Sequence, residues 1–426
     1  MILTPLLNLL APLVKGFVRR RLSKGLEEAP RLQERYGLPT VAMPAQGTQV
    51  VWFHGASVGE VMSLIPIIQG WKKKHPHHFI LLTTTTVTGG QLVQQRLGHI
   101  CTHQYTTFDI PKWGQRFLDF WNPCLAVFAE SEIWPNQMHA LKRRGIPLVL
   151  LNGRLSPRSL ERWKKIPKLA KNIFSTITLC LAQDETTAQN FSDLGVETVK
   201  TITNLKFLAE PLPVDEDVFS FFSSICARRP VWVVASTHPG EEEMAIHCHE
   251  KIKAVIPDLL TFIIPRHPKR VDEVSHILDK KGIMYQRRKA FDVTKKVDVC
   301  LVDSLGEMGV FYKLAHVVFL GGSLVPIGGH NPIEPALFAK PIVWGPHIHK
   351  TVAIGQTFAN ALCQIKTPEE LAHMTQKLLQ DRNLADTYGK ACLAVVQAQA
   401  QQLDMILDIL SEIQAPHLAN SVVSSA

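Results

Sequence analysis

A glycine-rich stretch in the second half of the chain carries the clearest sign of chemistry. It reads GGSLVPIGGHNPIEP over Gly321–Pro335 and follows the apolar run Val317–Leu320. Glycine allows a positive φ and a close backbone approach, so a glycine-rich turn after a strand can bind an anion. Asn331 is a good helix cap, Pro332 suits a first helical position, and Glu334 lies three residues after the cap. These features predict a phosphate or nucleotide site, although a capping box between Asn331 and Glu334 accounts for the same residues.

Two glutamates and a lysine in the first half are candidates for acid–base chemistry. In FHGASVGE, Glu60 follows a predicted strand ending at His54, and a carboxylate at a strand end suits a general base. Ser57 and Glu60 also have the S-x-x-E spacing of a capping box, which gives Glu60 a structural role. Glu130 ends another predicted strand, where carboxylates are usually exposed caps. Lys206 precedes a proline-rich break and is available to an anionic substrate, although most lysines are solvated surface residues.

Three loops of the second half follow predicted strands and together predict a nucleotide pocket. The guanidinium of Arg266 is a planar fork suited to a phosphate or carboxylate, and Gly306 again exposes the backbone. Glu334 is expected to accept hydrogen bonds from ribose hydroxyls, because phosphates would repel it. Neither half has a G-x-G-x-x-G after its first strand or a G-x-x-x-x-G-K-[ST], which excludes dinucleotide dehydrogenases and P-loop ATPases. The pocket residues that we expect are Pro265, Arg266, Gly306, Glu307, Met308, Asn331, Pro332, Ile333 and Glu334.

Alternating strands and helices must position these residues. Short apolar runs such as VVWFHG alternate with helical segments, among them one expected over Pro157–Phe174, and the pattern restarts with VWVVAST at Val231–Thr237. This alternation predicts parallel sheets covered on both faces, with ligands beyond the strand carboxyl ends. We therefore predict an α/β protein of two Rossmann-like, doubly wound domains facing across a cleft. The expected parts are a membrane-associating segment (1–40), an acceptor-binding domain (41–208), a linker (209–217), a nucleotide-sugar-binding domain (218–395) and a C-terminal helix and tail (396–426).

Composition agrees with a two-domain globular protein. The chain has 426 residues, too many for one ordinary core. Its eight cysteines are scattered and form no CxxC, a pattern that favours reduced thiols in a cytoplasmic protein over a disulfide framework or a zinc site.

The N-terminal segment is apolar and is followed by basic residues. MILTPLLNLLAPLV is interrupted by Pro5, Asn8 and Pro12 and is short for a bilayer core of about 30 Å. Positive charge follows this segment, including Arg19–Arg21, whereas a signal peptide carries its charge first. We expect insertion into one leaflet with the cations among anionic headgroups; the alternative is a helix packed on its own domain. Nucleic-acid binding is not expected, because aromatic residues are not interleaved with the basic ones.

Seven ordered motifs resemble the Kdo transferases of lipopolysaccharide synthesis, which have the GT-B fold. The resemblance extends from the N-terminus to about residue 400. In that family 3-deoxy-D-manno-octulosonic acid (Kdo) passes from CMP-Kdo to the lipid A precursor, lipid IVA. The resemblance implies the same donor and acceptor, at the cytoplasmic side of the bacterial inner membrane. The motifs are FHGASVGE, AESEIWPN, NGRLSPRS, TNLKF, IIPRHPKR, SLGEMGVFY and GGSLVPIGGHNPIEPA.

The same resemblance implies roles for the candidate residues. Glu60 matches the base that deprotonates the acceptor hydroxyl, Glu130 and Lys206 match positions that assist around the transition state, and the three loops match the CMP-binding loops. The chain has Ile327 and Thr203 where the family commonly has His and Gly. The family implies that no metal or other cofactor is required. Two alternatives remain at this point: a GT-B transferase or epimerase that uses a UDP-sugar, and a non-catalytic lipid-binding homologue.

Overall fold

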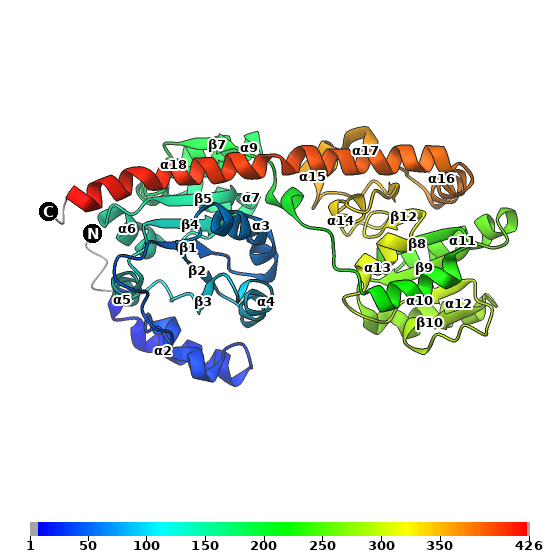
Figure 1. The fold of residues 1–426 in the computed structure, drawn as a ribbon, viewed down its shortest axis with the longest axis horizontal. Helices are drawn as coiled ribbons and strands as arrows, with labels where there is room; N and C mark the ends of the chain where they lie inside the picture. The colour runs from blue at the N-terminus through cyan, green and yellow to red at the C-terminus, as the bar shows by residue number, and fades with distance from the viewer. Residues whose placement is uncertain (1–6, 424–426) are drawn as a thin grey trace. The chain divides into compact units, whose positions relative to one another are not determined.

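The chain folds into two compact units. The computed structural model describes the backbone of residues 7–423 and the side chains of residues 7–414. Unit 1 contains the chain up to Ala209 and again from Ala400, and unit 2 contains Glu210–Gln399. The C-terminal helix therefore belongs with the first half of the sequence (Figure 1).

Unit 1 is built on a parallel seven-stranded sheet in the order β3-β2-β1-β4-β5-β6-β7. Its strands are β1 (Val50–His54), β2 (Phe79–Thr84), β3 (Thr102–Tyr105), β4 (Leu125–Ala129), β5 (Leu148–Gly153), β6 (Leu179–Ala182) and β7 (Val199–Thr201). Its helices are α2 (Ala11–Ser23), α3 (Val58–Lys74), α4 (Val87–Leu97), α5 (Pro111–Trp121), α6 (Pro135–Arg143), α7 (Pro157–Lys164), α8 (Pro167–Phe174), α9 (Glu185–Leu194), α18 (Gln402–Val423) and the 3₁₀ helices η1 (Ala29–Tyr36) and η2 (Leu205–Leu208).

Side chains of unit 1 fill a core on each face of this sheet. Phe53 packs with Trp71 of α3 and Leu407 of α18 on one face, whereas Trp52 packs with Phe117 of α5 on the other. Successive residues of a strand point to opposite faces, and a parallel sheet covered by helices buries both. The uninterrupted apolar strands of the sequence follow from this arrangement.

Unit 2 repeats the plan with the order β10-β11-β9-β8-β12-β13-β14, again all parallel. Its strands are β8 (Val231–Thr237), β9 (Leu260–Pro265), β10 (Tyr285–Arg287), β11 (Val299–Leu301), β12 (Val317–Leu320), β13 (Ile342–Trp344) and β14 (Cys363–Gln364). Its helices are α10 (Glu216–Cys226), α11 (Glu241–Val255), α12 (Val271–Lys280), α13 (Met308–Leu314), α14 (Ile333–Ala336), α15 (Val352–Phe358), α16 (Pro368–Gln380), α17 (Arg382–Ala400) and the 3₁₀ helices η3 (Pro268–Arg270), η4 (Arg288–Ala290) and η5 (Ala359–Ala361). The two parallel sheets confirm the predicted pair of Rossmann-like units.

One helix differs from its predicted extent. The segment expected as a single helix over Pro157–Phe174 forms α7 and α8, which are separated at Lys165 and Ile166. Pro167 occupies the first position of α8. Proline lacks the N–H that a helix interior needs and disfavours helical geometry in the residue before it, so one helix ends and another begins here.

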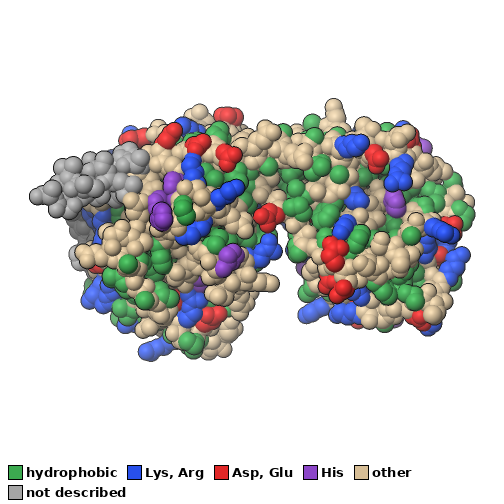
Figure 2. All heavy atoms as spheres, in the orientation of Figure 1, with side chains coloured by type: hydrophobic (Ala, Val, Ile, Leu, Met, Phe, Trp, Pro, Cys, Tyr) green, Lys and Arg blue, Asp and Glu red, His purple; other side chains and the backbone are tan. Residues whose placement is uncertain are grey.

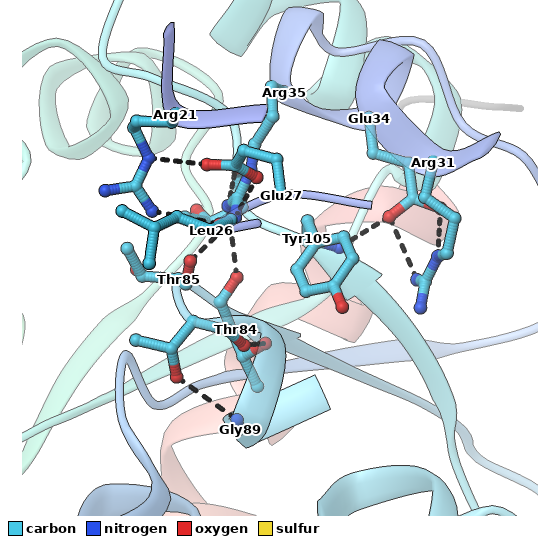
Figure 3. A network of polar contacts seen from close by, with 12 residues as sticks. Arg21, Leu26, Glu27, Arg31, Glu34, Arg35, Thr84, Thr85, Gly89 and Tyr105 are labelled. Carbon is cyan, nitrogen blue, oxygen red and sulfur yellow. Dashed lines mark hydrogen bonds and ion pairs between the residues drawn. The ribbon is translucent and has the colours of Figure 1, made fainter. Parts of the chain in front are cut away.

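Part of the basic N-terminal segment is bound within unit 1 through a buried carboxylate (Figure 3). Glu27 accepts hydrogen bonds from Arg21 Nε at 2.7 Å and from Arg35 Nε at 2.8 Å. The side chains of Glu27 and Arg35 are each 1% exposed. Arg35 also donates to the carbonyl of Thr85 at 2.6 Å, beyond the end of β2. These residues therefore join the segment to the carboxyl edge of the sheet, which corrects the expectation that Arg21 lies among lipid headgroups.

The start of the expected membrane segment, residues 1–6, lies outside the described part of the chain. Within residues 7–423, no helix combines the length and the apolar character needed to cross a membrane. All eight cysteines are buried free thiols.

Candidate active site

The carboxyl edge of the unit 1 sheet holds a histidine and a glutamate in direct contact. His54, the last residue of β1, is buried, and its Nδ1 lies 2.8 Å from Thr83 Oγ1. Its Nε2 lies 3.1 Å from Glu132 Oε2, to which Trp134 Nε1 also donates at 2.9 Å. Burial alone favours a protonated carboxyl, but the bonds from His54 and Trp134 outweigh it and lower the pKa of Glu132. Glu132 is therefore a fixed negative charge.

Glu60 lies near this charge in the first turn of α3. The N–H groups of Ala56 and Ser57 donate to its Oε2, the latter at 3.3 Å, and complete the expected capping box. Burial and the negative charge of Glu132 raise the pKa of Glu60, partly offset by the bond from Ala56. Both capping bonds end on Oε2, so Oε1 is not used by them. The capping role and a role as proton acceptor are thus compatible.

Glu130 has a backbone conformation that non-glycine residues rarely adopt. Its φ is 55°, in the left-handed region, which costs free energy unless the surroundings impose it. The N–H of Glu130 donates to Leu151 O at 2.9 Å, and Arg154 Nε lies 3.5 Å from its Oε2. The charge of Glu130 also contributes to the raised pKa of Glu60. The fold therefore brings Glu60, Glu130 and Glu132 together at one edge of the sheet.

Lys206 is positioned at the same edge by two asparagines. Asn152, near the end of β5, accepts a hydrogen bond from the Leu205 N–H at 3.2 Å. Asn204 caps η2 by accepting from the Lys206 N–H at 3.1 Å. Asn152 has a φ of 57°, a conformation that asparagine tolerates better than most residues. This local structure places the backbone of Lys206 beside the ends of β5 and β6.

The glycine loop of unit 2 binds an anion, but the anion belongs to the protein. Glu241, at the start of α11, is fully buried. Its carboxylate accepts hydrogen bonds from the N–H groups of Gly322 at 2.7 Å and of Ser323 and Leu324 at 3.0 Å each. It also accepts from the His238 N–H at 3.0 Å. The sequence-based interpretation that this part of the loop binds a phosphate through its backbone is therefore wrong for these amides.

The second part of the loop forms a shorter helix than expected. Helix α14 has four residues and begins at Ile333, with Pro332 in the capping position. Asn331 Oδ1 accepts from the Ile333 N–H at 3.1 Å. Asn331 and Pro332 therefore stand one position earlier, relative to the helix, than the sequence pattern indicates. The carboxylate of Glu334 lies close enough to buried Tyr312 to affect its ionisation: burial raises the pKa of Tyr312, and the charge of Glu334 raises it further.

The other two predicted loops also lie at the carboxyl edge of this sheet. Arg266 follows β9, and its N–H donates to Thr237 O at 3.0 Å while its side chain is exposed. Gly306 has a φ of 84° and precedes α13, which begins at Met308. The carboxylate of Glu307 binds Arg288, with Nη2 at 2.9 Å and Nε at 3.1 Å. The side chain of Glu307 therefore holds its own loop in place, and the backbone groups of the loop are the ones available to bind a ligand.

Sequence reasoning did not select His54, Glu132 or Glu241 as site residues. His54 and Glu132 belong to the same motifs as Glu60 and Glu130. Their position in those motifs could have indicated that they are site residues. Glu241 begins an acidic run whose partner loop is about 80 residues away, so no local pattern connects the two. Among the side chains of residues 7–414, no group of three or more from His, Cys, Asp or Glu is disposed to hold a metal ion.

Two Rossmann-like units, each with candidate residues at the carboxyl edge of a parallel sheet, are the plan of the GT-B fold. The structure is similar to that of a glycosyltransferase from Rickettsia africae, with a TM-score of 0.58 at 13% identity over 86% of this chain and 99% of that one. Residues 30–209 match the family model described as 3-deoxy-D-manno-octulosonic-acid transferase.

Curated relatives agree over nearly the whole length. A 3-deoxy-D-manno-octulosonic acid transferase of Haemophilus influenzae is 33% identical, covering 98% of this chain and 99% of its own. A transferase of the same name from Rickettsia bellii is 31% identical, covering 95% and 97%. The chain belongs to the 3-deoxy-D-manno-octulosonic acid (Kdo) transferase family and is a glycosyltransferase. The resemblance of the seven motifs is thereby confirmed.

Proposed function

We propose that the protein transfers Kdo from CMP-Kdo to the lipid A precursor, with Glu60 as general base. The observation that carries this proposal is the environment of Glu60, where burial and the charge of Glu132 raise the pKa of a carboxyl at a sheet edge. A base is most effective when its pKa approaches the working pH. Membership in the Kdo transferase family supports this substrate pair over a UDP-sugar.

The proposed reaction divides its tasks between the units. Glu60 of unit 1 accepts the proton of the acceptor hydroxyl, whose oxygen forms a bond to the anomeric carbon of Kdo. The bond from that carbon to the phosphate oxygen breaks, and CMP leaves with the electron pair. Attack opposite the departing phosphate inverts the anomeric centre. Arg266 of unit 2 stabilises the negative charge on the phosphate.

The remaining candidate residues support the two substrates. Glu130 and Lys206 assist around the transition state from the same sheet edge as Glu60. The backbone of residues 306–308 and of residues 331–334 holds the nucleotide, with Glu334 accepting hydrogen bonds from ribose hydroxyls. These assignments rest on the placement of both loops after β11 and β12, where parallel sheets bind ligands.

The Glu60→Gln variant tests the base. We expect transfer, followed by mass spectrometry of the lipid products, to fall by about a hundredfold or more, because a general base contributes about 10²–10⁴-fold. CMP binding and the unfolding midpoint should stay near the parent values, because glutamine keeps an acceptor for the cap. Exposed Glu161 of α7 provides the matched control, Glu161→Gln. Normal turnover by folded Glu60→Gln protein would remove Glu60 as the base.

A titration with nucleotides tests the donor. We expect CMP to bind and UDP to bind at least about tenfold more weakly, a difference of about 1.4 kcal/mol. Binding of UDP without CMP would support the UDP-sugar alternative. Binding of the lipid A precursor without release of CMP from CMP-Kdo would support a non-catalytic lipid-binding protein.

We also propose that α2 attaches the protein to an anionic membrane surface without crossing it. In α2, Leu13 is 72% exposed and Phe17 is half-exposed, and Leu9 in the turn before the helix is 73% exposed. Arg20 and Lys24 follow on the exposed side of the segment. Figure 2 shows hydrophobic and basic side chains next to one another over this part of unit 1. Apolar side chains that enter the headgroup region, flanked by cations, are typical of interfacial helices.

Vesicle sedimentation tests this attachment. The parent protein should bind vesicles that contain anionic phosphatidylglycerol more tightly than purely zwitterionic vesicles, and added salt should weaken binding. Leu13→Asp should reduce binding by about tenfold or more, because it removes apolar burial and adds a repelled charge. Leu169→Asp changes an equally apolar, 50% exposed residue of α8 and should have no effect. Equal losses in both variants would contradict a role for α2.

A further inference from the structure

Two histidines of unit 2 form a hydrogen-bonded pair beside the glycine loop. Nε2 of His238 lies 2.8 Å from Nε2 of His330, and the rings are nearly parallel at 8°. His238 follows β8 and His330 follows β12, two neighbouring strands of the sheet. Because one nitrogen must donate and the other accept, the neutral pair holds one proton between the rings. Both side chains are half-buried.

Cationic side chains approach the pair from the loops after β9 and β13. From the loop after β9 come Arg266 and Arg270. The imidazole of His267 lies in the same loop, and its ring centroid is 6.2 Å from that of His238. Lys350 approaches from the loop after β13. Burial and these positive charges lower the pKa of His238 and lower that of His330 to about 4. The pair is therefore neutral at neutral pH in the absence of an added anion.

The nearby carboxylates already have partners. Glu241 accepts the four backbone N–H groups described above. Glu242 lies 3.6 Å from Arg270, which also lies 3.1 Å from Glu273. Arg270 is thus shared by two carboxylates, and Arg266 and Lys350 are the cations near the imidazoles that remain for one more anion.

The glycines of the loop make room for this cluster. A Cβ on Gly322 would lie 3.2 Å from His330 Nε2 and 3.4 Å from His238 Cδ2. A Cβ on Gly328 would lie 2.7 Å from Lys350 Cγ. Both glycines have a positive φ, 68° and 113°, which other residues rarely adopt. The loop therefore provides space for imidazoles and a lysine, whereas the amides of residues 322–324 bind Glu241.

We propose that His238 and His330 bind the phosphate of the nucleotide donor and take up one proton from solvent as it binds. The inference deepens the proposed function and rests on it. Adding one proton preserves the Nε2–H···Nε2 bond and makes both Nδ1 atoms donors. A phosphate anion favours this charged form, because an opposite charge nearby stabilises it. Arg266 and Lys350 neutralise the rest of the phosphate charge.

Calorimetry of CMP binding between pH 6 and pH 8.5, in two buffers of different ionisation enthalpy, tests the proposal. The parent protein should take up a proton, and its affinity for CMP should fall as the pH rises, by up to about tenfold per pH unit for one linked proton. His330→Asn and His238→Asn should each weaken CMP binding by about tenfold or more and abolish the uptake. Cytidine, which lacks the phosphate, should bind all three proteins equally. Exposed His276 of α12 provides the control, His276→Asn.

Each outcome separates the inference from the proposed function. CMP binding that is tight, independent of pH and unchanged in folded His238→Asn and His330→Asn overturns the histidine pair and leaves Kdo transfer intact. Proton uptake with CMP-Kdo but not with CMP assigns the pair to the sugar carboxylate and overturns the phosphate. A further outcome is that CMP fails to bind the parent protein while inorganic phosphate binds with a proton uptake that both variants lose. That result would support the anion site and contradict CMP-Kdo as the donor. Circular dichroism and the unfolding midpoint establish that each variant is folded.

Discussion

Oε2 of Glu132 lies 3.1 Å from Nε2 of His54, so the end of β1 and the loop after β4 are joined by a hydrogen bond from an imidazole to a carboxylate. This contact keeps Glu132 ionised, and its charge in turn acts on Glu60. The contact thereby contributes, after burial, to the raised pKa of the proposed base.

Replacing Glu132 by glutamine should change the pH dependence of transfer. The pKa of Glu60 is raised by burial and by Glu132, so the base loses its charge, and transfer falls, at a higher pH than for an ordinary glutamate. Glu132→Gln removes the like charge and should move the acidic limb of kcat/KM toward lower pH. At pH 8 the rate should stay within about tenfold of the parent, because Glu60 is ionised there in both proteins.

The displacement of the acidic limb, and not the rate alone, is the informative measurement for Glu132. A purely structural role for this residue would lower the rate at every pH and leave the limb in place. Glu161→Gln, on the exposed face of α7, should leave both limb and rate unchanged.

Glu241 should stabilise unit 2 through the glycine loop. Glu241→Gln keeps the shape of the side chain but directs an NH₂ group at backbone donors that now bind a carboxylate. Loss of acceptors for buried N–H groups costs about 1–3 kcal/mol each, so we expect a loss of about 2–4 kcal/mol in the unfolding free energy of unit 2 and weaker CMP binding.

Calorimetric unfolding of Glu241→Gln and Glu243→Gln checks this expectation. Glu243 belongs to the same first turn of α11 but is exposed, so its replacement controls for the charge at the helix start. Equal effects of the two substitutions would mean that helix-end electrostatics, and not the loop contacts, account for the loss.

Local patterns predicted the elements well but could not identify which groups meet across the sheet. The apolar strands specified two parallel sheets, because a strand buried on both faces must be apolar throughout. The spacing of Ser57 and Glu60 predicted a capping box, which the structure confirms. The glycines around Gly322 correctly indicated an anion site, but the anion is Glu241, and only the adjacency of β8 and β12 brings the two together. His238 and His330 meet through the same adjacency.

Kdo transfer should continue in the presence of EDTA. We assign the phosphate charge to Arg266 and its cationic neighbours instead of a divalent ion. The initial rate should be measured with about 5–10 mM EDTA, which is in excess over trace metals. It should equal the rate with added Mg²⁺ within about twofold. A loss that Mg²⁺ restores would contradict the assignment.

Glu27 should hold the N-terminal segment on unit 1. Its two oxygens bind Arg21 and Arg35, and Glu27→Ala leaves the guanidinium of Arg35 buried without its carboxylate. Breaking a buried ion pair by removing one partner costs about 3–5 kcal/mol. We expect a loss of that size in the free energy of unfolding, measured in urea by tryptophan fluorescence. This signal reports mainly on unit 1, because six of the eight tryptophans lie there (Trp52, Trp71, Trp113, Trp121, Trp134 and Trp163), whereas Trp232 and Trp344 lie in unit 2.

The control for Glu27 is an exposed pair on the same unit. Glu161 and Lys164 form an i,i+3 ion pair with side chains 67% and 51% exposed, and such pairs contribute about 0–1 kcal/mol. Glu161→Ala should therefore leave the unfolding midpoint nearly unchanged. Because Glu27 and Arg35 join η1 to the carboxyl edge of the sheet while Leu13 of α2 is exposed to solvent, Glu27→Ala should also weaken vesicle binding by the folded protein. Unchanged vesicle binding, together with the expected loss of stability, would separate the attachment of α2 to lipid from its anchoring on unit 1.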